Sequence, residues 1–439
     1  MQNPEAHTAL VDAERTTDPA EDALRPRRAS SISMPDASGI LREASRVPQQ
    51  GDLIGKLASN RYSVGANTEI YALAAAMDKS ATTLAVGVVD EQGVPLGLIS
   101  RQHLFDHLGK LYGRDLYKRK QVSELLQPAR AFRDDLNVFV ASEQLRDDLQ
   151  RMDDTWYVLV DAKGRFSGVF SSKNLLIYLS ETTARDLALA RRLQSAIVRE
   201  GLCLERPRFA LACYSKMAKE VGGDFYLVKE LDEKRVLLAL CDVSGKGIAA
   251  SLVTAVLGGI FDTYSAHTSL KVFLRRLSRY LYETFRLDYF VTGIFMEFNL
   301  ERGEATICDM GHSYLLLVRG KKLLRAGSRA LNPPLGVAPD TMPVLSGFRL
   351  GSGDLVLLFT DGLVDQRNAC GAEYSENRLW RLLRTHADLP VQQIRDRISS
   401  DCERFREGEP QGDDLTFMML RFGGPGAPVA PPPAKTTDS

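Results

Sequence analysis

The sequence predicts an α/β protein with more than one domain, and three observations carry this prediction. A length of 439 residues leaves room for two or three domains. The first half contains a repeated pattern that is typical of a strand, a turn, a strand and a helix. In the second half, apolar runs typical of buried strands end at aspartates that lie beside or near glycines. These features predict five parts, which are residues 1–48, 49–178, 179–202, 203–423 and 424–439.

The two ends of the chain are predicted to be flexible tails. Residues 1–48 are polar with little periodicity, and residues 424–439 are rich in Pro and Gly. The segment Arg27-Arg28-Ala29-Ser30 resembles a site for a basophilic kinase, and a solvated basic tail is the alternative.

Composition and charge argue against several classes of protein. Lys plus Arg and Asp plus Glu number 56 each, so the chain has no overall basic field for nucleic acid. The six cysteines form no Cys-x-x-Cys pair, which argues against a zinc site or a disulfide framework. Apolar stretches are too short to span a membrane, and the N-terminus lacks a signal-peptide pattern. We therefore expect a cytoplasmic protein that binds neither nucleic acid nor membrane.

An internal repeat with an offset of 71 residues occupies residues 49–178. The offset aligns Asp90 with Asp161, Gly93 with Gly164, Gly97 with Gly168 and Ser100 with Ser171. Each copy is predicted to form a strand, an Asp-x-x-Gly turn, a second strand and a helix. In each copy a serine, Ser100 or Ser171, ends the second strand, and its hydroxyl is well placed to cap the helix that follows.

The repeated unit resembles a tandem CBS module. The resemblance implies a cleft between the repeats that binds an adenine nucleotide, through a Thr or Ser followed three residues later by Asp. The corresponding positions here are Ser100 with His103 and Ser171 with Asn174, so neither copy has the Asp. The residues therefore leave two roles open, which are sensing of a nucleotide or other small molecule and a purely structural or dimerising role.

A helix over residues 182–198 is predicted to join the two halves of the chain. Either threonine at its start, Thr182 or Thr183, can cap it. Leu189 or Ala190, Leu193 and Ile197 follow at intervals of three or four residues and form one apolar stripe. An ordinary packed helix and a parallel dimer helix are both consistent with this stripe.

Residues 203–423 contain four acidic turns. They read Gly222-Gly223-Asp224-Phe225, Asp242-Val243-Ser244-Gly245-Lys246-Gly247, Thr360-Asp361-Gly362 and Gly412-Asp413-Asp414-Leu415-Thr416. Carboxylates at strand ends, with no His or Cys cluster nearby, are typical ligands of hard divalent cations. Two such ions with a bridging water would suit hydrolysis of a phosphate ester. The alternative is that each Asp only closes a turn.

The order of the motifs resembles the PPM-type serine/threonine phosphatases, and most closely their bacterial sporulation and stress-response branch. The motifs that extend the resemblance are Asp309-Met310-Gly311-His312 and Asn332-Pro333-Pro334-Leu335-Gly336-Val337. The resemblance covers about residues 203–423 and implies an αββα sandwich, in which helices flank two central sheets. It also implies a pair of Mn²⁺ or Mg²⁺ ions and removal of phosphate from serine or threonine of a protein.

The resemblance assigns roles to five residues. It implies that Asp224 and Asp242 are shared or bridging ligands, that the backbone carbonyl of Val243 completes one metal, and that Asp361 and Asp413 hold the other. Many members carry a further Asp three residues after the first, where this chain has Leu227, and we interpret this as a lost outer contact. The Ala190-Arg191-Arg192-Leu193-Gln194 run resembles the coupling helix found before many such domains.

Two further side chains near these motifs have open roles. His312 is a candidate to bind phosphate or protonate the leaving group, and the alternative is that it stabilises the turn after Asp309. Lys246 lies in an acidic turn, where it could attract phosphate as a point charge or remain a solvated loop residue.

The sequence as a whole predicts a metal-dependent protein phosphatase that is regulated by its N-terminal module and forms a homodimer. The expected substrate is a phosphorylated bacterial signalling protein, such as an anti-sigma-factor antagonist. One alternative is a catalytically degenerate domain that sequesters a signalling partner, and Leu227 favours it. A second alternative is a hydrolase of nucleotides or small phosphates, against which the lack of a Gly-rich phosphate loop argues.

Overall fold

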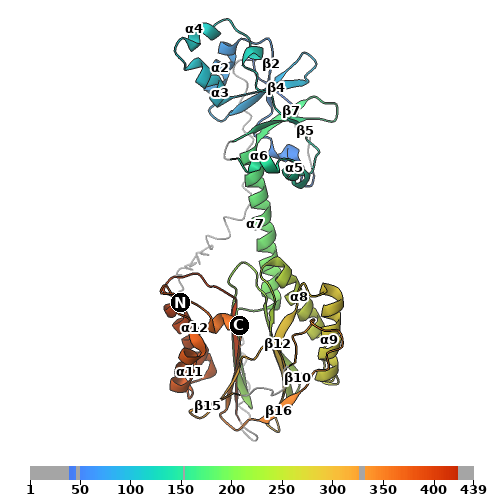
Figure 1. The fold of residues 1–439 in the computed structure, drawn as a ribbon, viewed down its shortest axis with the longest axis vertical. Coiled ribbons are helices and arrows are strands. Elements are labelled where there is room, and N and C mark those ends of the chain that lie inside the picture. Colours follow the sequence, from blue (N-terminus) through green and yellow to red (C-terminus); the bar gives the residue numbers. More distant parts are fainter. Residues whose placement is uncertain (1–38, 46–49, 152–153, 326–331, 424–439) are drawn as a thin grey trace, which may run out of the picture. The chain divides into compact units, whose positions relative to one another are not determined.

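The computed structural model describes residues 39–45, 50–151, 154–325 and 332–423. The chain divides into two compact units, Met1–Leu179 and Ser180–Ser439 (Figure 1). The predicted tails lie outside the described residues, apart from residues 39–45. Within the described ranges, no helix combines the length and the apolar character that a membrane span requires.

The first unit contains two small sheets, with strand orders β1-β2-β3-β4 and β5-β6-β7. Its elements up to the end of the second sheet are β1 (Arg42–Glu43), η1 (Ile54–Leu57), β2 (Tyr62–Gly65), α2 (Ile70–Lys79), β3 (Ala85–Val89), β4 (Pro95–Ser100), α3 (Arg101–Leu108), α4 (Gly113–Tyr117), η2 (Val122–Leu125), β5 (Ala131–Arg133), α5 (Val138–Gln144), α6 (Arg146–Leu149), β6 (Trp156–Val160) and β7 (Phe166–Ser171). In each sheet a strand pairs parallel with the next after a helical crossover, and an antiparallel hairpin follows.

The two hairpins repeat each other in detail, as the 71-residue offset predicts. In the first, the Asp90 carboxylate accepts the N–H groups of Gln92 and Val94. In the second, Asp161 accepts the equivalent pair of N–H groups. Gly93 and Gly164 have φ values of +81° and +75°, a conformation that favours glycine. The predicted Asp-x-x-Gly turns are therefore confirmed in both copies.

The segment that precedes each repeat packs into the other repeat. Ile54 and Leu57 of η1 lie in the core of the second repeat, while Val122 and Leu125 of η2 lie in the core of the first. Backbone hydrogen bonds follow the same exchange, because Ile54 N–H donates to Leu136 C=O at 2.8 Å. This exchange ties the two repeats into one unit.

The helices after the two hairpins begin as predicted, but the second continues further than predicted. The hydroxyls of Ser100 and Ser171 each accept the backbone N–H three residues later, which confirms both as caps. After Ser171, α7 (Ser172–Ile197) runs unbroken for 26 residues. The prediction that a separate helix starts at Thr182 is therefore wrong, since no Gly or Pro interrupts the segment.

The second unit is a sandwich of two antiparallel sheets with helices on both outer faces (Figure 1). The sheets have the orders β10-β11-β12-β13-β16 and β15-β14-β17-β18-β9-β8. Its elements are β8 (Gly201–Arg206), β9 (Phe209–Lys216), β10 (Asp224–Asp232), β11 (Arg235–Val243), α8 (Ile248–Asp262), α9 (Leu270–Phe285), β12 (Val291–Asn299), β13 (Glu304–Met310), β14 (Leu315–Arg319), β15 (Lys322–Arg325), β16 (Ser346–Arg349), β17 (Leu355–Phe359), α10 (Asp361–Val364), α11 (Ser375–His386), α12 (Val391–Arg406) and β18 (Leu415–Phe422).

The sequence of strand β17 is an unbroken apolar run because both faces of the strand are buried. Val356 and Leu358 face the core between the two sheets and beneath α8 and α9. The alternate residues Leu355, Leu357 and Phe359 face the core beneath α11 and α12. The sheet of β17 is therefore covered by the other sheet on one face and by α11 and α12 on the other, as in the αββα sandwich that the sequence resemblance implied.

A glycine between the two repeats of the first unit offers a test of its packing. A Cβ atom added to Gly87 in β3 would lie 2.0 Å from the ring of Phe166. We expect Gly87→Ala to lower the free energy of unfolding of the first unit by about 1–3 kcal/mol through overpacking. Gly65→Ala is the matched control, because its Cβ would meet only Thr68 Oγ1 at 3.7 Å. Thermal unfolding of the full chain measures both, and equal melting temperatures would contradict close packing of Phe166 on β3.

Candidate active site

Two of the predicted ligands lie opposite each other on neighbouring strands of one sheet. Asp224 begins β10 and Asp242 lies at the end of β11, and the two are direct partners across the β10–β11 ladder. The chain turns away after Asp242 through Gly245, whose φ is +90°. The strand pairing therefore places both carboxylates at the same edge of the sheet.

The other two predicted ligands come from the second sheet. Asp361 begins α10 directly after β17, and Asp413 lies just before β18. Strands β17 and β18 are antiparallel neighbours, with Phe359 opposite Phe417. The end of β17 and the start of β18 therefore deliver Asp361 and Asp413 to one edge.

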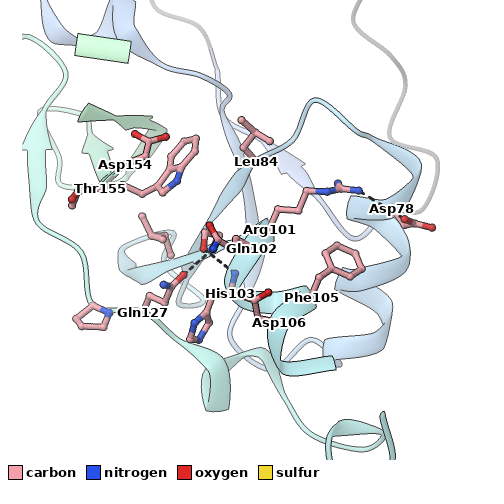
Figure 2. A pocket seen from close by; sticks show the side chains of 14 residues that line it. Asp78, Leu84, Arg101, Gln102, His103, Phe105, Asp106, Gln127, Asp154 and Thr155 are labelled. Atoms are coloured by element: carbon pink, nitrogen blue, oxygen red, sulfur yellow. Dashed lines mark hydrogen bonds and ion pairs between the residues drawn. The ribbon is translucent and has the colours of Figure 1, made fainter. Parts of the chain in front are cut away.

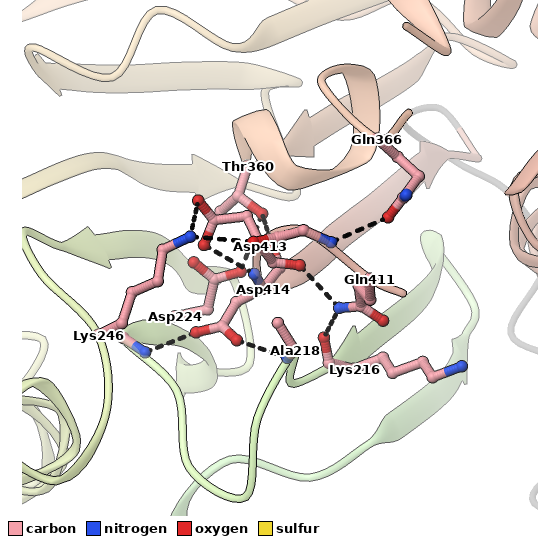
Figure 3. A network of polar contacts seen from close by, with 11 residues as sticks. Lys216, Ala218, Asp224, Lys246, Thr360, Gln366, Gln411, Asp413 and Asp414 are labelled. Atoms are coloured by element: carbon pink, nitrogen blue, oxygen red, sulfur yellow. Dashed lines mark hydrogen bonds and ion pairs between the residues drawn. The ribbon is translucent and has the colours of Figure 1, made fainter. Parts of the chain in front are cut away.

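Thr360 connects these two edges. Its hydroxyl lies 2.9 Å from Asp224 Oδ2, to which it donates a hydrogen bond, and it accepts the N–H of Thr416 at 3.0 Å. The Thr360 side chain is fully buried, and Figure 3 shows it beside Asp224, Asp413 and Asp414. Sequence reasoning assigned no role to Thr360, because its partner Asp224 is 136 residues away.

Asp414 holds the loop that leads to Asp224. One carboxylate oxygen accepts the N–H of Ala218 at 2.7 Å, and the other accepts the N–H of Gly223 at 2.6 Å (Figure 3). Sequence reasoning placed Asp414 in a motif but gave it no function. Asp414 therefore fixes the loop that contains Gly222 and Gly223, here called the glycine loop, against β18.

Burial and repulsion from neighbouring carboxylates raise the pKa values of Asp224 and Asp242. Burial raises the pKa of Asp224 well above its usual range, and the charges of Asp242 and Asp414 raise it further. Burial, followed by the charges of Asp361 and Asp413, raises the pKa of Asp242 to about 7. The aspartates of both sheets therefore act on one another within a single, partly buried cluster, where a cation would offset their repulsion.

Lys246 is part of this cluster. Its Nζ lies 2.9 Å from Asp413 Oδ2 and donates to the carbonyl of Gly412 at 3.0 Å. The contact with Asp413 raises the pKa of Lys246. Since Lys246 already pairs with a predicted ligand, an ion that binds Asp413 would compete with this pair.

The donor set fits a hard divalent cation, because every donor is a carboxylate or carbonyl oxygen. The carbonyl oxygen of Val243 lies close to the glycine loop, since a Cβ on Gly223 would be 2.8 Å from it. In the part of the chain that the structure describes, no three His, Cys, Asp or Glu side chains form a ready-made metal-binding group. Carboxylates would therefore have to reorient when an ion binds.

The His312 side chain is buried, and its hydrogen bonds indicate a structural role. Its backbone N–H donates to Asp309 Oδ1 at 2.8 Å, and its Nε2 lies 2.9 Å from the carbonyl of Phe359. A carbonyl only accepts, so Nε2 carries the proton, and Nδ1 accepts from the Thr292 hydroxyl at 3.1 Å. Burial lowers the pKa of His312, so the ring is held neutral between β12 and β17. This favours the interpretation that His312 stabilises the turn after Asp309.

Leu227, at the position where the sequence resemblance implies a further Asp, packs against the core beneath α8 and α9. It is partly buried and faces Ala239 across the β10–β11 ladder. Its side chain therefore contributes apolar packing and offers no oxygen to the acidic cluster.

The four candidate ligand residues of the first unit fall into two different environments. Ser100 and His103 line a cleft of about 900 Å³ together with Gln127 and Trp156, among other residues (Figure 2). Burial, followed by the charge of His107, lowers the pKa of His103.

The second pair lies outside the lining of that cleft. Ser171 Oγ accepts the N–H of Asn174 at 3.3 Å, and Asn174 Oδ1 accepts the N–H of Ser171 at 2.9 Å. These reciprocal bonds cap α7 and use the acceptor oxygens of both side chains.

Comparison with known proteins identifies part of the second unit. Residues 232–423 match the family model described as Stage II sporulation protein E (SpoIIE). The phosphoserine phosphatase RsbP of Bacillus subtilis is 27% identical over 247 residues, which cover 54% of this chain and 58% of RsbP. The phosphoserine phosphatase RsbU of the same organism is 25% identical over 215 residues, which cover 48% of this chain and 62% of RsbU.

A solved structure, the SiaA-PP2C domain of Pseudomonas aeruginosa, matches with a TM-score of 0.47 and 21% identity, over 56% of this chain and 98% of that domain. The chain thus spans less than two thirds of the length of the two curated relatives. The range matched by the family model contains Asp242, Val243, Asp361 and Asp413, while Asp224 precedes it. Residues 232–423 of this chain are therefore similar to the SpoIIE family.

Proposed function

We propose that this chain is a metal-dependent protein serine/threonine phosphatase, which hydrolyses phosphoserine or phosphothreonine on a bacterial signalling protein such as an anti-sigma-factor antagonist. The observation that carries the proposal is the convergence of Asp224 and Asp242 from one sheet with Asp361 and Asp413 from the other. The likeness of the domain to phosphoserine phosphatases supports it. We place this activity in the cytoplasm.

The acidic cluster is the proposed binding site for two ions of Mn²⁺ or Mg²⁺. Asp224, Asp242, Asp361 and Asp413 and the carbonyl of Val243 would hold them. When bound, such ions supply an activated water and offset the charge on the phosphoryl oxygens. We assign the metal to this edge of the sandwich because carboxylate and carbonyl oxygens are the ligands that hard divalent cations prefer.

The residues around the cluster have supporting tasks in this proposal. Thr360 orients Asp224 through a hydrogen bond, and Asp414 fixes the glycine loop that precedes Asp224. Lys246, whose side chain is 45% exposed, offers a positive charge at the rim, where a phosphate group would approach.

The first unit is proposed to be a CBS-like sensor that regulates the phosphatase domain. The cleft lined by Ser100 and His103 is the proposed site for a nucleotide or another small effector. Ser171 and Asn174 are the less suitable pair, because they lie outside the lining of that cleft and Asn174 Oδ1 already accepts the N–H of Ser171.

A homodimer is proposed through α7. Leu189, Leu193 and Ile197, which form the predicted stripe, are 48%, 62% and 37% exposed. Apolar side chains at these intervals on one helix are suited to pairing with the same face of a second copy.

A catalytically degenerate domain that sequesters a phosphorylated partner is the second candidate. One observation favours it, which is the apolar packing of Leu227. Such a domain would bind the phosphoprotein without turning it over.

A substrate panel on the full chain tests the proposal against its alternatives. The panel contains a phosphoserine protein, nucleoside phosphates and p-nitrophenyl phosphate, each with Mn²⁺, for the wild type and for Asp361→Asn. We expect Mn²⁺-dependent release of phosphate from the phosphoprotein that Asp361→Asn abolishes. Preference for nucleoside phosphates would indicate a small-phosphate hydrolase. Binding of the phosphoprotein without turnover would indicate the degenerate domain.

A further inference from the structure

A groove between α11 and α12, here called the arginine groove, has a volume of about 350 Å³. The two helices contact each other and pack on one face of the second sheet (Figure 1). Four arginines line the groove, which are Arg378, Arg381, Arg397 and Arg404. Among the described residues in its lining, Asp401 is the only carboxylate. The groove therefore carries an excess of positive charge.

Asp401 shows how the groove holds a carboxylate. Arg378 Nε lies 2.8 Å from Asp401 Oδ2, and Arg378 Nη2 lies 3.0 Å from Oδ1, which is the forked geometry of a strong arginine–carboxylate pair. Arg404 Nη2 adds a longer contact of 3.4 Å. The bonds from Arg378 lower the pKa of Asp401, so this carboxylate stays charged and occupies two of the four arginines.

The other two arginines have no acidic partner. Arg381 and Arg397 are exposed, and neither forms a salt bridge within the described part of the chain. The one hydrogen bond of the Arg381 guanidinium is a long contact of 3.4 Å with Asn377 C=O in the same helix. Both guanidinium groups are therefore available to an anionic partner.

One end of the arginine groove is connected to the acidic site. The buried Gln366 accepts the N–H of Gly412 at 3.3 Å through Oε1, and Gly412 directly precedes Asp413. The Gln366 carbonyl accepts the N–H of Tyr374 at 2.8 Å, and the Tyr374 hydroxyl donates to Asp401 Oδ2 at 2.9 Å. A phosphoprotein with its phosphate at the acidic site would thus have the groove within reach of a neighbouring segment.

We propose that the arginine groove docks an acidic segment of the phosphoprotein substrate, separate in sequence from the phosphorylated residue. Arginine suits this task because its planar fork matches a carboxylate. The chain has equal numbers of basic and acidic residues, which argues against nucleic acid as the occupant. A groove between two helices fits a chain segment better than the plane of a membrane. This inference rests on the proposed function and adds a charge requirement to its substrate.

Two phosphoserine peptides of equal length and a pair of variants of the full chain test the inference. One peptide carries a run of glutamates joined to the phosphoserine by a flexible Gly/Ser linker, and the other has glutamines in place of the glutamates. The test variant combines Arg381→Gln with Arg397→Gln. Arg384→Gln is the matched control, because Arg384 is also an exposed arginine of α11 but lies outside the groove lining. Phosphate release with Mn²⁺ gives kcat and KM for each pair.

We expect the wild type to have a KM for the glutamate peptide that is about 5–25-fold below that for the glutamine peptide. Loss of one exposed ion pair costs up to about fivefold, and two are involved. The double variant should lose this difference, while its kcat and its turnover of p-nitrophenyl phosphate stay unchanged. Arg384→Gln should match the wild type, and higher ionic strength should narrow the difference.

A binding experiment separates the failure of the inference from the failure of the function. Fluorescence polarisation follows a labelled glutamate peptide without phosphoserine, with phosphatidylserine vesicles and duplex DNA as competitors. Equal KM values for the two peptides in the wild type, or an equal loss in Arg384→Gln, would overturn the inference. Preferred binding of vesicles or DNA would also overturn it. A wild type that binds the labelled peptide but turns over no phosphate compound would instead overturn the proposed function.

Discussion

Replacing Asp242 with Asn should reduce phosphatase turnover at a fixed Mn²⁺ concentration by more than about a hundredfold. Loss of a residue that only orients a metal ligand costs about 10–100-fold, and Asp242 is proposed to be a ligand itself. The neutral amide keeps the shape of the side chain but removes the charge that the ions require. Initial rates of p-nitrophenyl phosphate hydrolysis by the full chain measure the loss.

The same substitution should leave the metal-free fold intact. Burial and the neighbouring aspartates raise the pKa of Asp242 to about 7, so its charged form is unfavourable in the absence of an ion. Removing that charge should not lower the melting temperature of the metal-free chain. Asp262→Asn is the matched control, because that side chain is 92% exposed at the end of α8. Turnover by Asp242→Asn that equals the wild type at saturating Mn²⁺ would contradict the role of Asp242 as a ligand.

Substitution of Gly222 by Ala should disrupt the site by steric conflict. An added Cβ would lie 2.2 Å from Asp414 Oδ2 and 2.3 Å from Met217 Sδ. Asp414 cannot withdraw easily, since its two oxygens hold the N–H groups of Ala218 and Gly223. Overpacking costs about 1–3 kcal/mol, and a buried amide left without a partner costs about 1–3 kcal/mol more. We therefore expect a lower free energy of unfolding together with weaker Mn²⁺ binding.

A second glycine in the same region is the control for this experiment. Gly259 lies in α8, and a Cβ on it would have no atom within 4 Å. Since Ala favours a helix over Gly by up to about 1 kcal/mol, Gly259→Ala should leave stability unchanged or raise it. Urea unfolding of the full chain compares the two variants. Equal stability of Gly222→Ala and the wild type would show that the glycine loop can move away from Asp414, and would contradict the role of Asp414 in fixing it.

Local patterns predicted the strands that carry the site. The apolar runs before Asp242 and Asp361 form β11 and β17, and the 71-residue offset predicted the matching turns at Asp90 and Asp161. Each of these features depends on neighbours in sequence, such as alternating burial, a glycine at positive φ or a carboxylate that closes its own turn. The motif order then implied the αββα layers that bury both faces of β17.

The contacts that organise the site could not be predicted in this way. Thr360 meets Asp224 across 136 residues, and Asp414 meets Gly223 across 191 residues. Gln194 was named only within the run that resembles a coupling helix, and its contacts could not be predicted, because its partners are backbone groups and a hydroxyl of distant segments. The exchange of η1 and η2 between the two repeats likewise depends on tertiary packing that composition does not specify.

The most direct test of a catalytic metal site in this chain is hydrolysis of p-nitrophenyl phosphate by the full chain after removal of metal with a chelator, followed by titration with Mn²⁺. We predict no turnover in the chelated protein and a saturable return of activity as Mn²⁺ is added, with none in Asp361→Asn. Turnover that survives chelation, or that Asp361→Asn retains, would contradict a catalytic site built on these aspartates.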